Sequence, residues 1–321
     1  MHTVIDLYLR EKKRVFCAFI DYKKAFDLID RQHLWSKLVA HDINGRVLQV
    51  IHAIYRNAKS SVVNNGVKSG MFDCNVGVRQ GENLSPILFA IFLNDFGRFI
   101  SQYYNGLDNL SHSFRDHLSN DEVDIYLKLF TLLYADDTIV LAENHTDLQS
   151  ALNGVKDYCN TWNITVNTSK TQVVIFSRGK IRRIPEFYFG NEKVDVVDNY
   201  TYLGVTFNYN NKFTKTKCKQ ISSAKKAMFS LLNKSYNLQL PLDLLLELFD
   251  QLVLPILLYG CEVWGFEDIK QIEAFHLNFC KRVLKLKKST PNCMVYGELG
   301  RHKLIKLVEP RMVTFWGRIV R

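Results

Sequence analysis

Two adjacent aspartates, Asp136 and Asp137, lie between two apolar runs of the sequence. The runs, residues 129–133 and 138–141, are rich in residues that favour strands, so they predict a hairpin that displays the carboxylates at a rigid tip. Negative charges at a tight turn between buried strands are costly unless a cation lies beside them. The pattern alone also fits a solvated Asp-Asp turn, and additional ligands are needed to decide.

A third carboxylate stands far upstream. The segment VFCAFIDYKKAFDLID, residues 15–30, opens with an apolar strand pattern that ends at Asp21. If this strand lies beside the hairpin, Asp21 and Asp136 can bracket two Mg²⁺ ions about 4 Å apart, the arrangement used for in-line attack at phosphorus. Carboxylate ligands without neighbouring histidine or cysteine favour Mg²⁺ over zinc.

A glycine-bearing loop that runs into an apolar helix lies between the two acidic segments. It is GVRQGENLSPILFAIFLNDF, residues 77–96. Gly77 and Gly81 permit close approach of the backbone, and Ser85 and Pro86 are typical of a helix cap and a first turn. Ordinary punctuation between a loop and a helix would give the same local pattern.

Five segments follow one another between residues 15 and 207: FIDYKKAFD, RQGENLSPILF, YADD, WNITVNTSKTQVV (162–174) and YLGVTF (202–207). Taken in this order, they closely resemble the palm of reverse transcriptases, with the nearest likeness to those of LINE-type, non-LTR retrotransposons. Any one of them is weak evidence, but five in the family's order form a strong signal. Two further segments, YGCEVWG (259–265) and residues 290–304, are typical of the region after the palm.

The resemblance implies a role for individual residues. Asp21 and Asp136 match the family's metal-binding aspartates, and Asp137 matches the adjacent acidic residue. Phe26 matches the bulky aromatic beneath the sugar, where a ring would clash with a ribose 2′-hydroxyl and favour deoxynucleotides. Lys170 matches the basic residue that protonates or neutralises the departing pyrophosphate, although a solvated surface lysine is the alternative.

The remaining implied contacts are with substrate. Gln80 and Gly81 match residues that line the nascent base pair, and Tyr202, Leu203 and Gly204 match the hairpin that supports the primer end. The implied activity is RNA-directed DNA synthesis, in which a primer 3′-hydroxyl attacks the α-phosphate of a dNTP held by two Mg²⁺ ions. The implied partners are an RNA template, a DNA primer and dNTPs.

An α+β fold with an antiparallel sheet backed by helices is predicted to position these residues. The pattern predicts a helix over residues 1–14, two helices over 31–58 divided near Asn44, and a hairpin turn at Asn65-Gly66. Val47, Leu48, Ile51, Ile54 and Tyr55 are expected to form a core stripe. Thr146 and Gln149 predict a capping box for the next helix, residues 172–176 a strand, and residues 101–121 a loop.

Positive charge is concentrated in the last third of the chain. Residues 1–211 carry 23 basic and 23 acidic side chains, whereas residues 212–321 carry 19 and 9. We therefore expect a palm with partial fingers over residues 1–210 and a basic helical thumb and post-thumb region over 211–321, gripping phosphates. From Lys215 the periodicity is helical, with Lys217, Lys225 and Lys226 largely off the apolar face. Simple solubility is the alternative reason for such lysines.

Cysteine usage and hydropathy indicate the compartment. Seven cysteines without a CxxC pair indicate reduced thiols, and hence the cytoplasm or nucleus. The N-terminus is too charged for a signal peptide, and charged residues interrupt the most apolar span, residues 240–266, which excludes a bilayer-spanning helix there. His276, Cys280, Cys293 and His302 match no trusted zinc spacing and are expected to be core residues.

Asp21 lies so near residue 1 that little chain precedes it to form fingers, so we expect a fragment that preserves the polymerase centre. No endonuclease pattern accompanies it. One alternative is a noncatalytic nucleic-acid-binding remnant of such an element. Another is an RNA-templated RNA polymerase, which is disfavoured by Phe26 and by Ala135, where such enzymes commonly have glycine.

Overall fold

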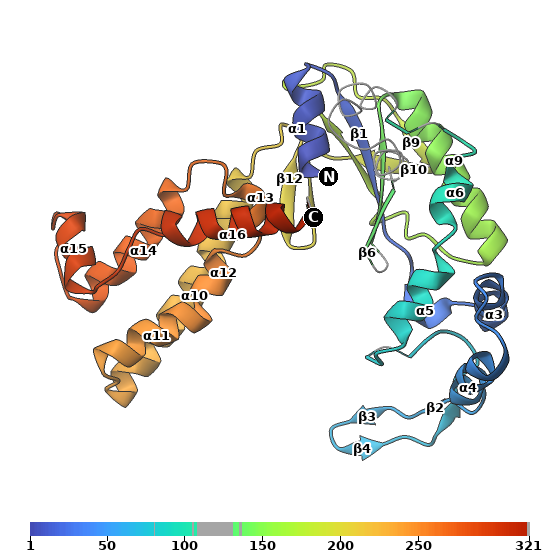
Figure 1. Cartoon of the computed structure of the whole chain (residues 1–321), viewed down its shortest axis with the longest axis horizontal. Coiled ribbons are helices and arrows are strands. Elements are labelled where there is room, and N and C mark those ends of the chain that lie inside the picture. Colours follow the sequence, from blue (N-terminus) through green and yellow to red (C-terminus); the bar gives the residue numbers. More distant parts are fainter. Residues whose placement is uncertain (80, 105, 108–130, 135–136, 320–321) are drawn as a thin grey trace. The chain divides into compact units, whose positions relative to one another are not determined.

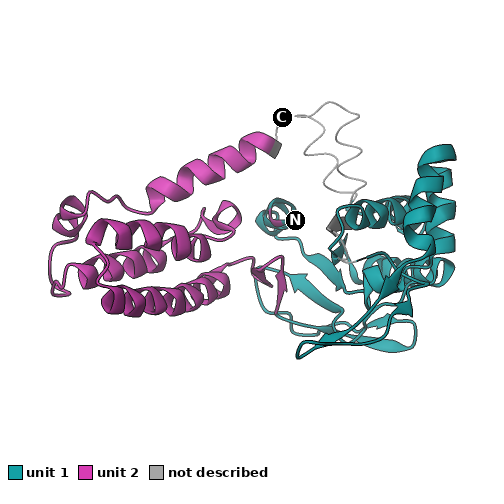
Figure 2. Ribbon diagram, turned by 90° about the horizontal axis from the view of Figure 1, so that it is seen from below, with its two compact units in different colours: residues 1, 3–198 teal, residues 2, 199–321 magenta. Residues whose placement is uncertain are grey.

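The structure, a computed structural model, describes residues 1–79, 81–104, 106–107, 131–134 and 137–319. The chain divides into two compact units, Met1 with residues 3–198 and His2 with residues 199–321 (Figure 2). Each unit has its own buried apolar residues. No helix in the described ranges combines the length and apolar character needed to cross a bilayer.

A six-stranded sheet forms the centre of the first unit. Its strand order is β6-β7-β1-β8-β10-β9, with β1 (Val15–Ile20) running antiparallel to both of its neighbours. Those neighbours are β7 (Asp137–Ala142) and β8 (Gln172–Phe176), and the outer strands are β6 (Thr131–Tyr134), β10 (Glu192–Val196) and β9 (Phe187–Phe189). All six side chains of β1 are buried, as expected of a central strand with both faces covered.

Helices pack against one face of this sheet. Alternate residues of β1, namely Phe16, Ala18 and Ile20, share a hydrophobic core with helical side chains. The helices that contribute are α3 (Arg31–Ala40), α4 (Gly45–Arg56), α5 (Ser85–Phe92), α6 (Phe96–Ile100) and α9 (His145–Trp162) (Figure 1). Two more helices, α1 (His2–Arg10) and α2 (Ala25–Leu28), flank β1 in sequence. The predicted α+β fold is confirmed.

Short hairpins extend from the α4 end of the first unit. One pairs β3 (Val63–Asn64) with β4 (Val67–Lys68), and the other pairs β2 (Lys59–Ser60) with β5 (Phe72–Asp73). Asn65 and Gly66 both have positive φ, 49° and 81°, which is the signature of a type I′ turn. The hairpin predicted from Asn65-Gly66 is therefore confirmed.

Two predicted helix caps are wrong. Asn144, rather than Thr146, caps α9, because its side-chain oxygen accepts the Asp147 N–H at 2.9 Å. Ser85 is the first residue of α5 rather than its cap, and its hydroxyl donates to the carbonyl of Arg79 at 2.5 Å. In both places the cap lies one or two residues before the predicted position, which is the usual uncertainty at helix ends.

The core stripe predicted for α4 is only partly correct. Ile51 and Tyr55 are buried and Leu48 is half-buried, but Val47 and Ile54 are exposed. Of the predicted loop over residues 101–121, most lies outside the described residues.

The second unit begins with a hairpin and continues as helices. The hairpin joins β11 (Asn199–Tyr202) to β12 (Val205–Asn208), and the long helix α10 (Thr214–Leu238) follows. The other helices are α11 (Leu242–Leu252), α12 (Leu254–Leu257), α13 (Cys261–Trp264), α14 (Lys270–Val283), α15 (Asn292–Glu298) and α16 (Ile305–Ile319). Phe249 and Phe279 stack in its core with ring centroids 3.7 Å apart, and His276 and Cys280 are buried, as predicted. The same prediction is wrong for Cys293 and His302, which are exposed.

One lysine of α10 is not where the sequence places it. Lys217 is buried, and its ammonium donates to Glu267 Oε2 at 2.7 Å, so it does not belong to an exposed basic face. Lys225 and Lys226 are exposed, as predicted. A lysine stem can cover apolar surface while its charge is paired, and periodicity alone does not distinguish this arrangement from solvation.

Candidate active site

Asp21 directly follows the central strand β1, at the edge of the core. Its side chain is 27% exposed, so the carboxylate lies where buried structure meets solvent. Strand pairing determines which residue lies opposite Asp21. Ile20 is the register partner of Thr138, so extending the antiparallel register by one residue places Asp21 opposite Asp137. Directly opposed residues point to the same face of a sheet. Two of the predicted acidic residues therefore lie opposite each other where the neighbouring strands β1 and β7 respectively end and begin.

The predicted hairpin around the Asp-Asp pair is confirmed in its strands. β6 and β7 are antiparallel, and Tyr134 is the register partner of Asp137, which is half-buried. Asp136, the predicted second metal ligand, lies outside the described residues, as does Ala135.

A polar loop on the other side of β1 also reaches Asp21. In this loop, residues 167–171, Asn167 donates a side-chain hydrogen bond to Asp21 Oδ2 at 3.0 Å. The hydroxyl of Thr171 accepts the backbone N–H of Asp21 at 3.3 Å. The ammonium of Lys170 lies 4.0 Å from Asp21 Oδ2, on a side chain that is 69% exposed. The structure thus brings the predicted catalytic lysine and aspartate together.

Phe26 connects the Asp21 segment to the glycine-bearing loop. Its ring stacks on Phe89 of α5 at a centroid distance of 4.8 Å, and its carbonyl accepts the N–H of Val78 at 2.7 Å. Gly77 has φ +77°, and a Cβ there would collide with the backbone of Asp27. The predicted close approach of the backbone is confirmed for Gly77. Only glycine tolerates such an approach at positive φ.

The other glycine of this loop has a different environment. Gly81 has φ +87°, but a Cβ built on it meets nothing within 4 Å. Gln80, its predicted companion at the base pair, lies outside the described residues. Beside the loop, Ser85 is buried and its Oγ lies 3.4 Å from the Tyr55 hydroxyl, while Arg79 pairs with Glu82 at 2.7 Å.

The predicted primer hairpin is formed in the second unit. Tyr202 and Val205 are register partners, so Leu203 and Gly204 form a two-residue turn. Their φ values of 46° and 77° indicate a type I′ turn, which places a leucine in a conformation that L-residues adopt at a cost of roughly 1–2 kcal/mol. The leucine side chain is 40% exposed at this tip.

Three residues that hold predicted site residues or their loops within the same unit were not identified from the sequence. Arg31 holds the glycine-bearing loop by donating to the carbonyls of Gly77 and Val76 at 2.9 and 3.2 Å. Tyr259 donates to the carbonyl of Leu203 at 3.1 Å, and Asn167 binds Asp21 as described above. Tyr259 and Asn167 lie in motifs identified from the sequence, but the partners of all three residues are 45 or more positions away, so spacing gave no signal.

The donor set suits a hard cation. The carboxylates of Asp21 and Asp137 offer oxygen ligands. The neighbouring Tyr22 phenol stays neutral, because burial raises its pKa. Within the ranges that the structure describes, no group of three or more His, Cys, Asp or Glu side chains is gathered as a metal site.

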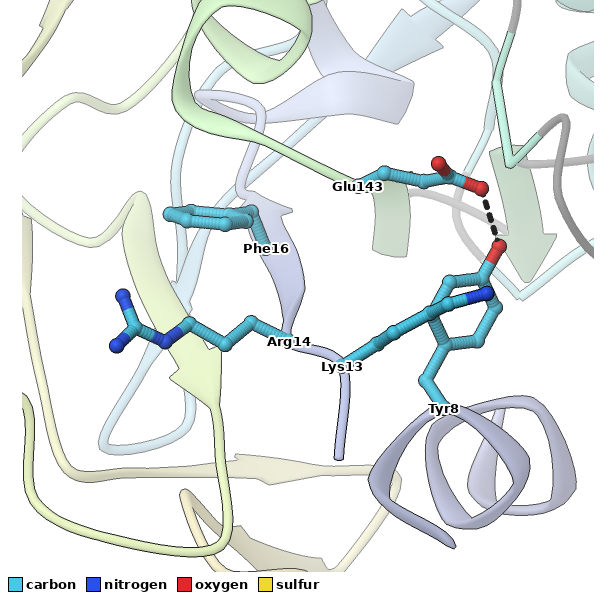
Figure 3. A pocket seen from close by; sticks show the side chains of 5 residues that line it. All are labelled: Tyr8, Lys13, Arg14, Phe16 and Glu143. Carbon is cyan, nitrogen blue, oxygen red and sulfur yellow. Dashed lines mark hydrogen bonds between the residues drawn. The ribbon is translucent and has the colours of Figure 1, made fainter. Parts of the chain in front are cut away.

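A concave site of about 320 Å³ lies at the opposite end of β1, away from Asp21. It is lined by Tyr8, Lys13, Arg14, Phe16 and Glu143, and the Tyr8 hydroxyl donates to Glu143 Oε1 at 2.5 Å (Figure 3). Arg14 and Phe16 are at the start of the strand whose far end precedes Asp21. This cavity is therefore separate from the candidate active site.

Comparison with known proteins identifies the fold family. The family described as reverse transcriptase (RNA-dependent DNA polymerase) matches residues 1–207. The chain belongs to the reverse transcriptase family. Members of this family are generally metal-dependent, in agreement with a carboxylate site at Asp21.

Named relatives come from non-LTR retrotransposons, which confirms the predicted LINE-type resemblance. The RNA-directed DNA polymerase from mobile element jockey of Drosophila funebris is 25% identical over 279 residues, covering 83% of this chain and 28% of that protein. A probable RNA-directed DNA polymerase from transposon X-element of Drosophila melanogaster is 24% identical, covering 94% of this chain and 33% of its own length. This reverse transcriptase chain thus spans a third or less of these relatives.

Among solved structures, telomerase from Candida tropicalis in complex with a TWJ fragment of telomeric RNA aligns with a TM-score of 0.42. The sequence identity is 14%, and the alignment covers 96% of this chain and 52% of that one.

Proposed function

We propose that this chain carries the polymerase centre of an RNA-directed DNA polymerase from a non-LTR retrotransposon. A primer 3′-hydroxyl attacks the α-phosphate of a dNTP opposite an RNA template, the new phosphodiester bond forms, and pyrophosphate leaves. The palm with partial fingers covers residues 1–210, and the basic thumb and post-thumb region covers 211–321.

Asp21, Asp136 and Asp137 would hold two Mg²⁺ ions in this proposal. When bound, the ions supply alignment of the attacking hydroxyl and neutralisation of charge on the phosphate. The position of Asp21 at the end of a fully buried strand supports this role, because a rigid strand fixes the carboxylate to within the tolerance that such chemistry needs.

Lys170 would stabilise the departing pyrophosphate. Its ammonium is 4.0 Å from Asp21 Oδ2 on a mostly exposed side chain, so it is close to the acidic centre yet able to move toward a phosphate. A cation there offsets the charge that develops as the bond to the leaving group breaks.

Substrate selection would rest on Phe26 and the glycine-bearing loop. The Phe26 ring is fixed by its stacking on Phe89, so it can exclude a ribose 2′-hydroxyl sterically. Gln80 and Gly81 would line the nascent base pair, and the open space around Gly81 supports close approach of a base. Tyr202, Leu203 and Gly204 would support the primer end.

The second unit would bind the template and primer through their phosphates. An exposed row of lysines on α10, which we call the lysine row, consists of Lys215, Lys219 and Lys226 at near-helical spacing. Cationic rows of this kind bind phosphate backbones without regard to sequence. The same row supports the second candidate function, a noncatalytic nucleic-acid-binding remnant. All seven cysteines are free thiols, which supports a place for either function in the cytoplasm or nucleus.

One observation carries the proposal: the strand that begins at Asp137 and the loop that contains Lys170 approach Asp21 from its two sides. All three residues lie within the part of the chain that matches the family. Primer extension on an RNA template with dNTPs and Mg²⁺ tests the proposal. With a fingers segment supplied in trans, we expect incorporation by the wild-type chain, none by Asp21→Asn, and wild-type rates for Asp195→Asn, which changes an exposed aspartate of β10 in the same sheet.

The outcomes separate the candidates. Incorporation of rNTPs that exceeds that of dNTPs would indicate an RNA polymerase, and Phe26→Val should raise rNTP use if the ring is the steric gate. Salt-sensitive duplex binding with no incorporation, even with fingers supplied in trans, would favour the noncatalytic remnant. Unchanged turnover in Asp21→Asn would contradict the polymerase assignment.

A further inference from the structure

Asn167 has more contacts with Asp21 than any role in loop formation requires. Its backbone N–H donates to the carbonyl of Asp21 at 2.7 Å, and its side-chain Nδ2 donates to the Asp21 carboxylate at 3.0 Å. Its own carbonyl accepts the N–H groups of Lys170 and Thr171 at 3.0 and 2.9 Å. One residue therefore links the carboxylate on β1 to the loop that carries the catalytic lysine.

The orientation of the Asn167 amide is fixed from both ends. Ser169 Oγ donates to Asn167 Oδ1 at 2.7 Å, which leaves Nδ2 to face Asp21. The same assignment follows from chemistry, since an ionised carboxylate can only accept hydrogen bonds. The amide thus presents a donor to Asp21 that is already oriented before any substrate binds.

This contact distinguishes the two oxygens of the Asp21 carboxylate. In the described part of the chain, the side-chain groups that approach it, Asn167 Nδ2 and Lys170 Nζ, both approach Oδ2. A carboxylate group whose Oδ2 accepts a hydrogen bond from a fixed donor cannot rotate freely. Its other oxygen, Oδ1, is therefore held in a single direction. Groups of this kind behind metal ligands orient them and tune their affinity.

We propose that Asn167 is a positioning residue of the reaction: its side chain holds Asp21 so that Oδ1 serves as the metal ligand, and its carbonyl anchors the backbone of Lys170 beside that carboxylate. The inference rests on the proposed polymerase function and deepens it. Asn167 touches neither substrate nor metal in this account, because it acts through Asp21 and Lys170.

Asn167→Ala isolates the side-chain contribution. The variant keeps the backbone hydrogen bonds of residue 167 to Asp21, Lys170 and Thr171, and it loses only the amide. Ser169→Ala is the graded comparison, because it removes the hydroxyl that orients the amide but no group that contacts Asp21. Asn153→Ala is the matched control, since that asparagine contacts Gln149 on an exposed face of α9.

The experiment measures Mn²⁺ binding to the full chain without substrate, by electron paramagnetic resonance of free Mn²⁺. We expect Asn167→Ala to weaken binding by about 10-fold or more, Ser169→Ala to weaken it less, and Asn153→Ala to leave it unchanged. Asp21→Asn gives the reference for loss of the ligand itself. Metal-free thermal unfolding of each variant shows whether a loss of affinity merely follows a loss of structure.

Primer extension provides the second readout. Asn167→Ala should need more Mg²⁺ for half-maximal rate and recover much of its rate at high Mg²⁺, while the KM for dNTP stays near the wild-type value. Equal Mn²⁺ affinity in Asn167→Ala and wild type would overturn this inference and leave the proposed function standing. A wild-type chain that binds no Mn²⁺ would overturn both.

Discussion

Replacing Gly77 by alanine should open the junction between the glycine-bearing loop and α2. The residue has φ +77°, and an added Cβ would lie 2.6 and 2.8 Å from the carbonyl carbon and Cα of Asp27. Left-handed backbone costs an L-residue roughly 1–2 kcal/mol. Forcing a methyl group into rigid backbone adds about 1–3 kcal/mol. The expected total is about 2–5 kcal/mol.

The chain offers matched controls for this prediction. Gly81 in the same loop and Gly66 in the β3–β4 turn also have positive φ, 87° and 81°, but nothing lies within 4 Å of a Cβ at either position. Alanine at these positions should therefore cost only the backbone term of roughly 1–2 kcal/mol. The difference between Gly77→Ala and the two controls measures the collision with Asp27.

Hydrogen exchange is the suitable assay, because a chain of two units has no single free energy of unfolding, whereas exchange reports local opening. The Val78 amide, which donates to the carbonyl of Phe26 at 2.7 Å, reports on the junction directly. In Gly77→Ala its exchange should accelerate by roughly 30-fold or more, since each 1.4 kcal/mol is a factor of ten. Equal acceleration in Gly77→Ala and Gly81→Ala would refute the reasoning.

Three further predictions concern stability and binding. Lys37→Ala should lower the local stability of the first unit by about 2–4 kcal/mol, measured by hydrogen exchange of the α3 amides, because the ammonium of this buried lysine lies 3.8 Å from the centroid of the Trp162 ring. The pKa of Glu273 is lowered from 4.5 because, although burial opposes it, hydrogen bonds to the carboxylate dominate. The ionised Glu273 carboxylate therefore adds stability above pH 4.5, and this stability is lost as the pH falls through the lower pKa of the folded state. The difference in thermal midpoint between wild type and Glu273→Gln should shrink in acid. A difference that stays constant with pH would contradict this prediction. Alanine at all three positions of the lysine row should reduce the salt slope of duplex binding by about 2–3, and an unchanged slope in filter binding would exclude the row as a phosphate contact.

Local patterns predicted the strands around the site well. The run QVVIF at residues 172–176 is apolar and β-branched, and it forms β8 with the predicted bounds. Asn65-Gly66 gives its turn because both residues tolerate positive φ. The acidic motifs also gave the neighbourhood of Asp21 and Asp137 correctly, because each follows or begins a strand whose burial is visible in its composition.

Features that depend on distant partners were not predictable in the same way. Asn144 and Thr146 are both good capping residues, and only the entry path of the chain decides for Asn144. Helical periodicity places Lys217 among the exposed lysines, but Lys217 is buried and its ammonium pairs with Glu267, which is 50 positions away. Asn167 belongs to the segment WNITVNTSKTQVV, but the role of its side-chain amide depends on Asp21, which is 146 positions away.

The central claim is that Asp21 and Asp136 hold a pair of metal ions, and anomalous diffraction from crystals grown with Mn²⁺, a primer, a template and a nonreactive dNTP tests it most directly. The account predicts two anomalous peaks about 4 Å apart, with a carboxylate oxygen of Asp21 as a ligand of the metal pair. Metal bound elsewhere, or an Asp21 carboxyl group more than roughly 10 Å from that of Asp136, beyond the reach of a shared pair, would contradict it.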